Sequence, residues 1–177
     1  MSETSNRHKA EAPKRVNFAV IVCSSSRYKS LKESKRLDDP SGDLIVQKLE
    51  ASGHKITIRK VVPDDKLTIQ RALMKALKSR KVEAIITCGG TGISPKDVTI
   101  EAVKPLLDKE LNGFGEIFRM LSYKEIGSAA ILTRALAGLS KGKVIFCIPG
   151  SPQSVRLSLE RLIIPEVGHI LKHAREH

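Results

Sequence analysis

Short apolar runs alternate with amphipathic segments from Val16 onward, and this alternation restricts the fold more than any other feature. Residues 16–23 and 84–88 are almost wholly apolar, as expected for strands buried on both faces. Residues 67–80 carry apolar side chains at helical spacing. Because parallel strands need crossover connections, this order predicts an α/β fold of three layers, α/β/α, with a mostly parallel sheet and helices on both faces.

The expected elements can be given as ranges. Strands are predicted over residues 16–23, 54–62, 84–88 and 143–148. Helices are predicted from the turn 39–43 to about 52, over 67–80 and 98–107, after 112–116 through 124, and as a pair from 152 to about 174. A basic loop is expected through Arg36, and residues 129–137 fit either a strand or a turn of helix. We expect residues 1–15 to form a flexible basic arm and residues 16–177 to form one domain.

A glycine-rich loop, Gly-Gly-Thr-Gly-Ile-Ser-Pro-Lys-Asp, follows directly on the predicted strand 84–88. Its glycines permit φ > 0 and let backbone amides approach an anion, while its hydroxyls and its lysine add donors and positive charge. The residues expected to bind phosphate are Gly89, Gly90, Thr91, Gly92, Ser94 and Lys96. Glycine-rich turns also occur where a chain only has to turn tightly. Neither common nucleotide-loop pattern is present, so nucleotide chemistry would need another scaffold.

Two carboxylates come at the same predicted edge of the sheet. Asp97 closes the glycine loop, and Asp64 follows the strand 54–62. The turns 24–26, 63–65, 89–97 and 149–151 should all converge at the carboxyl ends of the strands, where such sheets bind ligands. A pair of carboxylates beside phosphates fits Mg²⁺-assisted phosphoryl or nucleotidyl transfer. The alternatives are a helix terminus served by Asp97 and an ordinary turn residue at Asp64.

Composition narrows the class of protein. The chain has 177 residues, of which 41% are hydrophobic and only 3% aromatic, so one domain with an aliphatic core is expected. Because no apolar run approaches the ~18 residues of a membrane span and the N-terminus is polar, we expect a cytoplasmic protein without membrane contact. Cys23, Cys88 and Cys147 are widely spaced, which argues against disulfides and a zinc site and favours buried small side chains.

Positive charge is concentrated near the N-terminus. The net charge is +12, and residues 1–36 hold nine Lys or Arg against three Glu, which gives +6. Such an arm could bind nucleic acid, remain a solvated tail, or attract small anions. With so few aromatic residues and no nucleic-acid motif, nucleic-acid binding is the least favoured of the functions considered.

Five ordered motifs resemble the molybdopterin-binding proteins of molybdenum cofactor biosynthesis, the MogA/MoaB type. They are Asp-x-Ser-Gly at 39–42, Val-Pro-Asp-Asp at 62–65, the glycine loop with its Asp, Gly-Phe-Gly-Glu at 113–116 followed by Ser122, and Pro-Gly-Ser-Pro at 149–152. The resemblance extends over residues 16–171. It implies adenylyl transfer from Mg-ATP to molybdopterin.

The resemblance also implies roles for residues. Asp64 and Asp97 would be the catalytic carboxylates and would hold Mg²⁺, with ATP and molybdopterin as substrates. Residues that would bind the substrates besides the glycine loop are Ser24, Ser122, Pro149, Gly150 and Ser151. The family implies a homotrimer or a dimer of trimers, and other enzymes of the same pathway are conceivable partners.

Two departures from the family pattern keep a second function open. Lys96 stands where many active members have Arg, and it keeps the charge but loses bidentate phosphate binding. Asn112 stands where Pro is common, which should only loosen that turn. Some relatives bind molybdopterin without adenylylating it, so a carrier protein is the alternative. Since Asp97 is present, we favour the enzyme.

Overall fold

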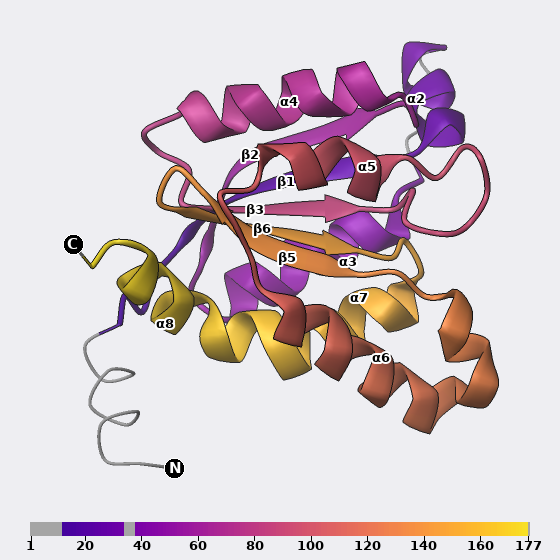
Figure 1. The fold of residues 1–177 in the computed structure, drawn as a ribbon. Coiled ribbons are helices and arrows are strands. Elements are labelled where there is room, and N and C mark those ends of the chain that lie inside the picture. Colours follow the sequence, from indigo (N-terminus) through magenta and orange to yellow (C-terminus); the bar gives the residue numbers. More distant parts are fainter. Residues whose placement is uncertain (1–11, 34–37, 177) are drawn as a thin grey trace.

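One sheet organises the computed structural model, which describes residues 12–33 and 38–176. Its strands are β1 (Asn17–Cys23), β2 (Lys55–Val62), β3 (Ala84–Cys88), β4 (Lys109–Glu110), β5 (Leu136–Ser140) and β6 (Lys143–Ile148). Within these residues the six strands lie in the order β2-β1-β3-β6-β5-β4 (Figure 1). β2, β1, β3 and β6 pair in parallel, whereas β5 pairs antiparallel with both β6 and β4.

Helices cover both faces of the sheet, as predicted. They are α2 (Ser25–Lys32), α3 (Pro40–Ala51), α4 (Lys66–Lys78), α5 (Thr99–Val103), α6 (Asn112–Ile126), α7 (Pro152–Ser158) and α8 (Ile164–Ala174). Short 3-10 segments η1 (Lys104–Leu106) and η2 (Gly127–Leu132) and a π-helical segment η3 (Leu159–Ile163) complete them. No helix in the ranges 12–33 and 38–176 is both long and apolar enough to cross a membrane.

Two apolar layers hold these helices on the sheet. On one face, α4 and α5 pack through side chains such as Ile69 and Leu73 against Ile21 and Ile85 of the central strands. The other face is covered by α3, α7, η3 and α8 (Figure 1). Each fully buried aliphatic side chain contributes about 1.5–3 kcal/mol of transfer free energy. The predicted three-layer α/β/α fold is therefore confirmed.

Some local predictions were wrong. Residues 25–32 form helix α2, not a loop; Ser24 caps it through a hydrogen bond from the Arg27 amide, but none of its side chains is buried. Because α2 buries no side chain, its sequence lacks an apolar stripe at helical spacing from which the helix could be predicted. Helix α6 begins at Asn112, so the Gly-Phe-Gly segment lies in its first turn. In the stretch 129–137, for which a strand or a turn of helix was expected, both occur: residues 129–132 lie in η2, and residues 136 and 137 begin β5. The short strand β4 was not predicted.

The strand order changes direction beside β1. The chain goes from β1 to β2 on one side and then returns to place β3 on the other side. The space outside the carboxyl ends of two such strands is where open α/β sheets bind ligands. Figure 1 shows the glycine loop and α2 at this edge, while the C-terminus and the start of β1 lie at the opposite edge.

The predicted domain boundary at residue 16 remains a prediction. Residues 1–11 of the expected arm lie outside the described residues. Of the basic loop expected through Arg36, residues 34–37 also lie outside them.

Candidate active site

The glycine loop begins by crossing the ends of three strands. The Gly89 amide donates a hydrogen bond to the Ile148 carbonyl oxygen at the end of β6, at 3.0 Å. Gly89 has φ +97°, and a Cβ atom there would lie only 2.5 Å from the carbonyl oxygen of Cys23 at the end of β1. Only glycine fits both the backbone conformation and this close approach.

The second glycine brings the loop beneath Asp64. Gly90 has φ +63°, and a Cβ atom on it would lie 2.4 Å from Thr99 Oγ1 and 3.2 Å from Asp64 Oδ1. The Thr99 amide, in the first turn of α5, donates to the Gly90 carbonyl oxygen at 2.9 Å. The bare Cα of Gly90 therefore faces the Asp64 carboxylate directly.

Asp64 itself is held by Ser25, the first residue of α2, which follows β1. Its Oδ2 accepts a hydrogen bond from the Ser25 amide at 2.8 Å, and Ser25 Oγ accepts one from the Asp64 amide at 2.9 Å. The next residue, Asp65, caps α4, and its pKa is lowered by hydrogen bonds from the hydroxyl and the amide of Thr68. Since Asp65 serves the helix, the Asp64 carboxylate is left to face the loop.

Asp97 holds the far end of the same loop. Its Oδ2 accepts from the Ser94 amide at 2.9 Å, and a Cβ atom on Gly92 would lie 2.7 Å from that oxygen. Helix α5 starts after Val98 and has no side-chain cap, so Asp97 does not serve the helix terminus. Of the two alternatives open in the sequence, a helix cap is excluded.

Arg134 fastens the loop from outside, and sequence reasoning missed it. Its Nε donates to the Thr91 carbonyl oxygen at 2.9 Å, and one Nη donates to the Asp97 carbonyl oxygen at 3.2 Å. The other Nη pairs with Glu101 at 2.5 Å, and this hydrogen bond lowers the pKa of the Glu101 carboxyl group. Arg134 lies between η2 and β5, in a stretch without clear periodicity, so no local signal could reveal this contact.

The Pro149–Ser151 turn closes the third side. Ser41 Oγ donates to the Gly150 carbonyl oxygen at 2.6 Å, and a Cβ atom on Gly150 would lie 3.1 Å from the Cα of Gly89. Ser151 caps α7 through the Ser154 amide. The predicted convergence of the strand-end turns is therefore present in the structure.

Buried Asp39 explains the Asp-x-Ser-Gly motif. Only 1% of Asp39 is exposed, and its carboxylate accepts from the Gly42 amide at 3.0 Å and from Arg59 at 2.9 Å. A buried carboxylate needs such partners. By fixing the start of α3, Asp39 positions Ser41 against the Gly150 turn.

The remaining predicted site residues differ in how far they are exposed to solvent. Ser24 caps α2, and its amide donates to the Val62 carbonyl oxygen at 2.9 Å, which joins the ends of β1 and β2. Lys96 and Ser94 are exposed on the loop, whereas Thr91 is buried. Ser122 is buried on α6, one turn before Glu125, which accepts from Gln153 in α7. Among the described residues, no hydrogen bond joins Ser122 to the glycine loop.

The cysteines are packing residues. All three are buried, and burial raises the pKa of Cys23 and of Cys88 to about 12 and that of Cys147 still further. Their burial confirms the prediction of buried small side chains, and the raised pKa values keep them protonated at neutral pH. Among the described residues, no group of three or more His, Cys, Asp or Glu side chains could hold a metal ion.

The chain is similar to known proteins over most of its length. The family model described as "Probable molybdopterin binding domain" matches residues 19–169. The chain is 47% identical over 164 residues to molybdenum cofactor biosynthesis protein B of Bacillus cereus, covering 92% of this chain and 93% of that relative. It is 48% identical over 173 residues to molybdopterin adenylyltransferase of Pyrococcus furiosus, covering 96% of this chain and 97% of that relative.

Solved structures share the fold. A crystal structure of molybdenum cofactor biosynthesis protein B superposes with a TM-score of 0.86 at 45% identity and covers 94% of this chain and 100% of that chain. The tungsten cofactor synthesizing protein MoaB from Pyrococcus furiosus superposes with a TM-score of 0.82 at 46% identity, covering 93% and 100%. The match shows that this chain belongs to the molybdopterin-binding domain family, as its motifs predicted.

Proposed function

We propose that the protein adenylylates molybdopterin, using Mg-ATP, in molybdenum cofactor biosynthesis. The observation that carries the proposal is the Asp64 carboxylate facing Gly90, because it brings an acidic group from one strand end onto a phosphate-type loop from another. Two relatives, at 48% and 42% identity, are named molybdopterin adenylyltransferase or probable molybdopterin adenylyltransferase. The proposal therefore rests both on the geometry of the loop and on sequence similarity to these two relatives.

The loop suits a triphosphate. Its backbone has positive φ at Gly89 and Gly90, and Gly92 has no side chain to occupy the space next to Asp97. Successive amides in such a loop form a concave site for anions. Lys96, exposed on the loop, supplies a mobile positive charge that favours the approach of ATP.

The residues present also fit Mg²⁺. This ion keeps several waters and is usually held by one or two carboxylates together with substrate phosphates. Asp64 and Asp97 would be those carboxylates, and the lack of a three-ligand cluster in the described ranges suits an ion held largely by its substrate. When bound, Mg²⁺ would offset the charge that develops on the transferred group.

In the reaction proposed, an oxygen of the terminal phosphate of molybdopterin attacks the α-phosphorus of ATP. The bond from the α-phosphorus to the oxygen bridging to the β-phosphorus breaks, and pyrophosphate leaves with that bonding pair. The protein contributes positioning and electrostatic stabilisation. The glycine loop would bind the triphosphate, while Ser24, Ser122, Pro149, Gly150 and Ser151 would line the pterin or nucleotide site.

The test is a direct assay of the purified protein with molybdopterin, ATP and Mg²⁺. We expect adenylylated molybdopterin and pyrophosphate from the unmodified protein and almost none from Asp64→Asn, with molybdopterin binding retained. Asp108→Asn is a matched control, because Asp108 accepts only from the Lys141 amide in the contacts described and lies beside β4. Product formation by Asp64→Asn at the normal rate would contradict the assigned role.

A carrier function is the second candidate, and Lys96 favours it because a lysine on the loop cannot bind a phosphate in the bidentate way that an arginine can. The same assay separates the two. Tight molybdopterin binding with no nucleotide-dependent product from the unmodified protein would support the carrier and remove the enzyme.

We also propose a homo-oligomer, either a trimer or a dimer of trimers. Helix α6 exposes a stripe at i, i+3 spacing: Ile117 (44%), Met120 (51%), Tyr123 (63%) and Ile126 (45%). The following segment η2 exposes Ile131 to 84% and Leu132 to 55%. A contiguous apolar face of this kind marks an interface. Ile131→Glu should lower the mass measured by sedimentation; an unchanged mass would place the interface elsewhere.

A cytoplasmic location stays a prediction, as does the absence of a nucleic-acid function. The second is tested by deleting residues 1–15 and measuring salt-dependent binding to DNA and RNA. A salt-sensitive affinity lost with the deletion would revive the nucleic-acid hypothesis.

A further inference from the structure

One buried hydroxyl group beside the glycine loop lacks a hydrogen bond. Thr99, the first residue of α5, is fully buried, and its Oγ1 is the one fully buried side-chain oxygen or nitrogen in the described ranges that makes no hydrogen bond. A buried hydroxyl without a partner is unfavourable, because it has given up its hydrogen bonds to water. An unsatisfied group of this kind needs an explanation, and a role in binding or catalysis is one.

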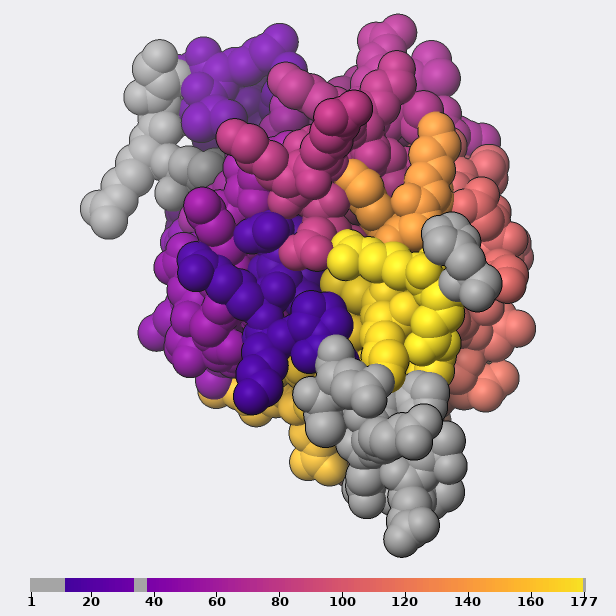
Figure 2. Space-filling model, turned by 90° about the vertical axis from the view of Figure 1, so that its left-hand side faces the viewer, coloured from indigo at the N-terminus to yellow at the C-terminus, as the bar shows by residue number. Residues whose placement is uncertain are grey.

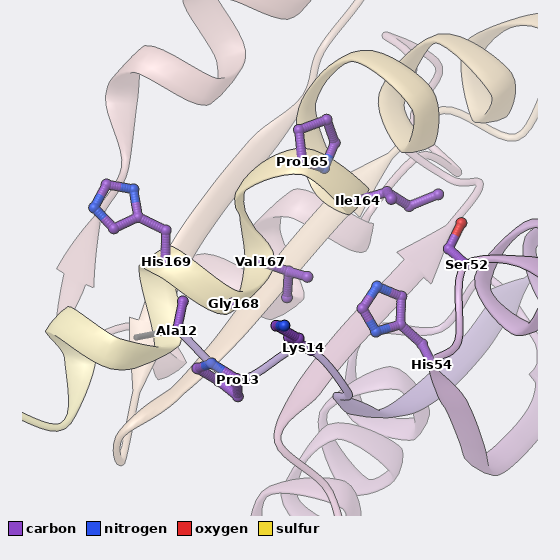
Figure 3. A pocket seen from close by; sticks show the side chains of 10 residues that line it. All are labelled: Ala12, Pro13, Lys14, Ser52, His54, Ile164, Pro165, Val167, Gly168 and His169. Carbon is purple, nitrogen blue, oxygen red and sulfur yellow. The ribbon is translucent and has the colours of Figure 1, made fainter. Parts of the chain in front are cut away.

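Buried polar side chains elsewhere have partners, as two examples show. In β3, Thr87 Oγ1 donates to the Phe146 carbonyl oxygen at 3.4 Å and lies 2.9 Å from Cys147 Sγ. At the opposite edge of the sheet, His54 Nδ1 accepts from the Val16 amide at 3.2 Å. Figure 3 shows the His54 ring at a cavity of about 260 Å³, which α8, yellow in Figure 2, helps to line. The unsatisfied hydroxyl therefore belongs to the glycine loop and not to this cavity.

The Thr99 hydroxyl and the Asp64 carboxylate lie on the same side of Gly90. A Cβ atom on Gly90 would lie 2.4 Å from Thr99 Oγ1 and 3.2 Å from Asp64 Oδ1, so both oxygens are within a few ångström of one point. Glycine places no side chain at that point. The Thr99 amide also donates to the Gly90 carbonyl oxygen at 2.9 Å, which joins the start of α5 to the loop.

Asp64 is able to accept a hydrogen bond from this hydroxyl. Its Oδ2 accepts from the Ser25 amide at 2.8 Å, whereas Oδ1 is the oxygen nearer to the side-chain position of Gly90. An ionised carboxylate has about four lone-pair sites, so a hydroxyl bound to Oδ1 leaves sites for a metal ion. A hydrogen bond to a carboxylate is about twice as strong as one between neutral groups.

The Cys23 thiol is the weaker alternative partner. Burial raises the pKa of this thiol to about 12, while the Thr99 hydroxyl lowers it and the Asp64 charge raises it further. The three groups are therefore close together, but the hydroxyl and the thiol do not meet in hydrogen-bond geometry. Because a thiol is only a weak donor and a weak acceptor, the carboxylate is the better partner for the hydroxyl proton.

We propose that Thr99 is a positioning residue for Asp64. When the glycine loop binds the triphosphate, the Thr99 hydroxyl donates to Asp64 Oδ1 and, together with the Ser25 amide on Oδ2, fixes the carboxylate that would hold Mg²⁺. Because Thr99 is fully buried, its effect passes through Asp64 and not through a contact with substrate. The inference rests on the adenylylation proposed above and adds a residue to it.

Two substitutions separate the hydroxyl from the shape of the side chain. Thr99→Val keeps the shape and removes the hydroxyl, whereas Thr99→Ser keeps the hydroxyl. We expect Thr99→Val to lower kcat for adenylylation by about tenfold or more. Calorimetry with Mg²⁺ and α,β-methylene-ATP, which cannot be cleaved at the α-phosphorus, should show a similar loss of affinity. Thr99→Ser should retain most of both, and molybdopterin affinity should stay the same in either variant.

Thermal unfolding without substrates gives a readout that a structural role would change. Thr99 Oγ1 has no hydrogen bond to lose, so Thr99→Val should leave the unfolding midpoint unchanged or raise it. Thr87→Val is the matched control, because it removes a buried hydroxyl that contacts Phe146 and Cys147. It should lower the midpoint and leave the nucleotide affinity unchanged. In an Asp64→Ala background, Thr99→Val should not weaken the nucleotide affinity further.

Several results would overturn the inference. Unchanged kcat and nucleotide affinity in Thr99→Val would mean that the hydroxyl does not position Asp64. Equal defects in Thr99→Ser and Thr99→Val would assign the effect to packing. A further loss of affinity in the Asp64→Ala background would show that Thr99 acts elsewhere. Absence of product from the unmodified protein would count against adenylylation instead, and the nucleotide affinities would still decide the role of Thr99; a protein that also binds no nucleotide would overturn both.

Discussion

The β2–α4 turn and the β3–α5 loop each bring an aspartate to the carboxyl edge of the sheet, but they use it differently. Asp64 is held by Ser25, the first residue of α2, which lies 39 residues earlier in the chain. Asp97 is held by Ser94, three residues away in its own loop. One carboxylate therefore joins two separate segments, whereas the other shapes the segment that contains it. Two aspartates at the same site can therefore have different structural roles.

Replacing each aspartate by asparagine is the sharpest way to break this comparison. Both changes remove a negative charge from the site, so we expect kcat for adenylylation to fall on the order of 100-fold or more in each. Only Asp97→Asn should also loosen the loop, because it weakens the hydrogen bond from the Ser94 amide. Hydrogen exchange at Ser94 would detect this; equal exchange in both variants would show that Asp97 does not shape its loop.

Gly90→Ala should have the next largest effect, because it adds a side chain where the two segments meet. The new Cβ would lie 2.4 Å from Thr99 Oγ1, and the residue would keep φ +63°. Gly53→Ala is the matched control, since Gly53 has φ +82° with no atom within 4 Å of the added Cβ. The control isolates backbone strain, about 1 kcal/mol.

Urea unfolding of the two glycine variants would separate strain from collision. Gly90→Ala should lose roughly 2–3 kcal/mol of unfolding free energy, more than the control, and should also lose most of its activity. Equal losses in stability would mean that the loop moves freely away from Thr99 and Asp64, and that the close contact is not needed.

The sequence could predict a site residue where that residue acts together with its neighbours in the chain, but not where its partners are distant in sequence. Glycines after a buried strand indicate a tight turn. The alternation of strands and helices places that turn at the edge of the sheet where Asp64 also lies. Family membership and the three-layer fold followed from these local patterns. Helix α2 was missed because it buries no side chain. Arg134 was missed because its partners are 33 to 43 residues away, and only the folded chain brings them together.

Arg134 offers a way to change the loop without touching either aspartate. Arg134→Lys keeps the charge but cannot hold the Thr91 and Asp97 carbonyl oxygens and Glu101 at once, because it lacks the planar fork. We expect about a tenfold loss in kcat/KM, mainly through the KM for ATP if the loop binds phosphates. Unchanged KM with reduced kcat would indicate that the clamp positions Asp97 more than the phosphate cradle.

The smallest expected effect is on stability at acid pH. The Glu101 pKa is lowered from its ordinary value of 4.5 by the Arg134 hydrogen bond. A carboxyl group whose folded pKa is depressed stabilises the fold above its unfolded pKa, and this stability is lost as the pH falls through the folded value. The pair is about one-third to one-half exposed, so its contribution is below about 1 kcal/mol.

Urea unfolding measured at pH 7 and at pH 3 would show this contribution. Arg134→Ala should lower the unfolding free energy more at pH 7 than at pH 3, since the pair is weakened at pH 3 even in the unmodified protein. A loss that is the same at both pH values would mean that Arg134 stabilises the loop through the two carbonyl oxygens alone. In that case the hydrogen bonds to the two backbone carbonyl oxygens would hold the loop, and the ion pair with Glu101 would add nothing to its stability.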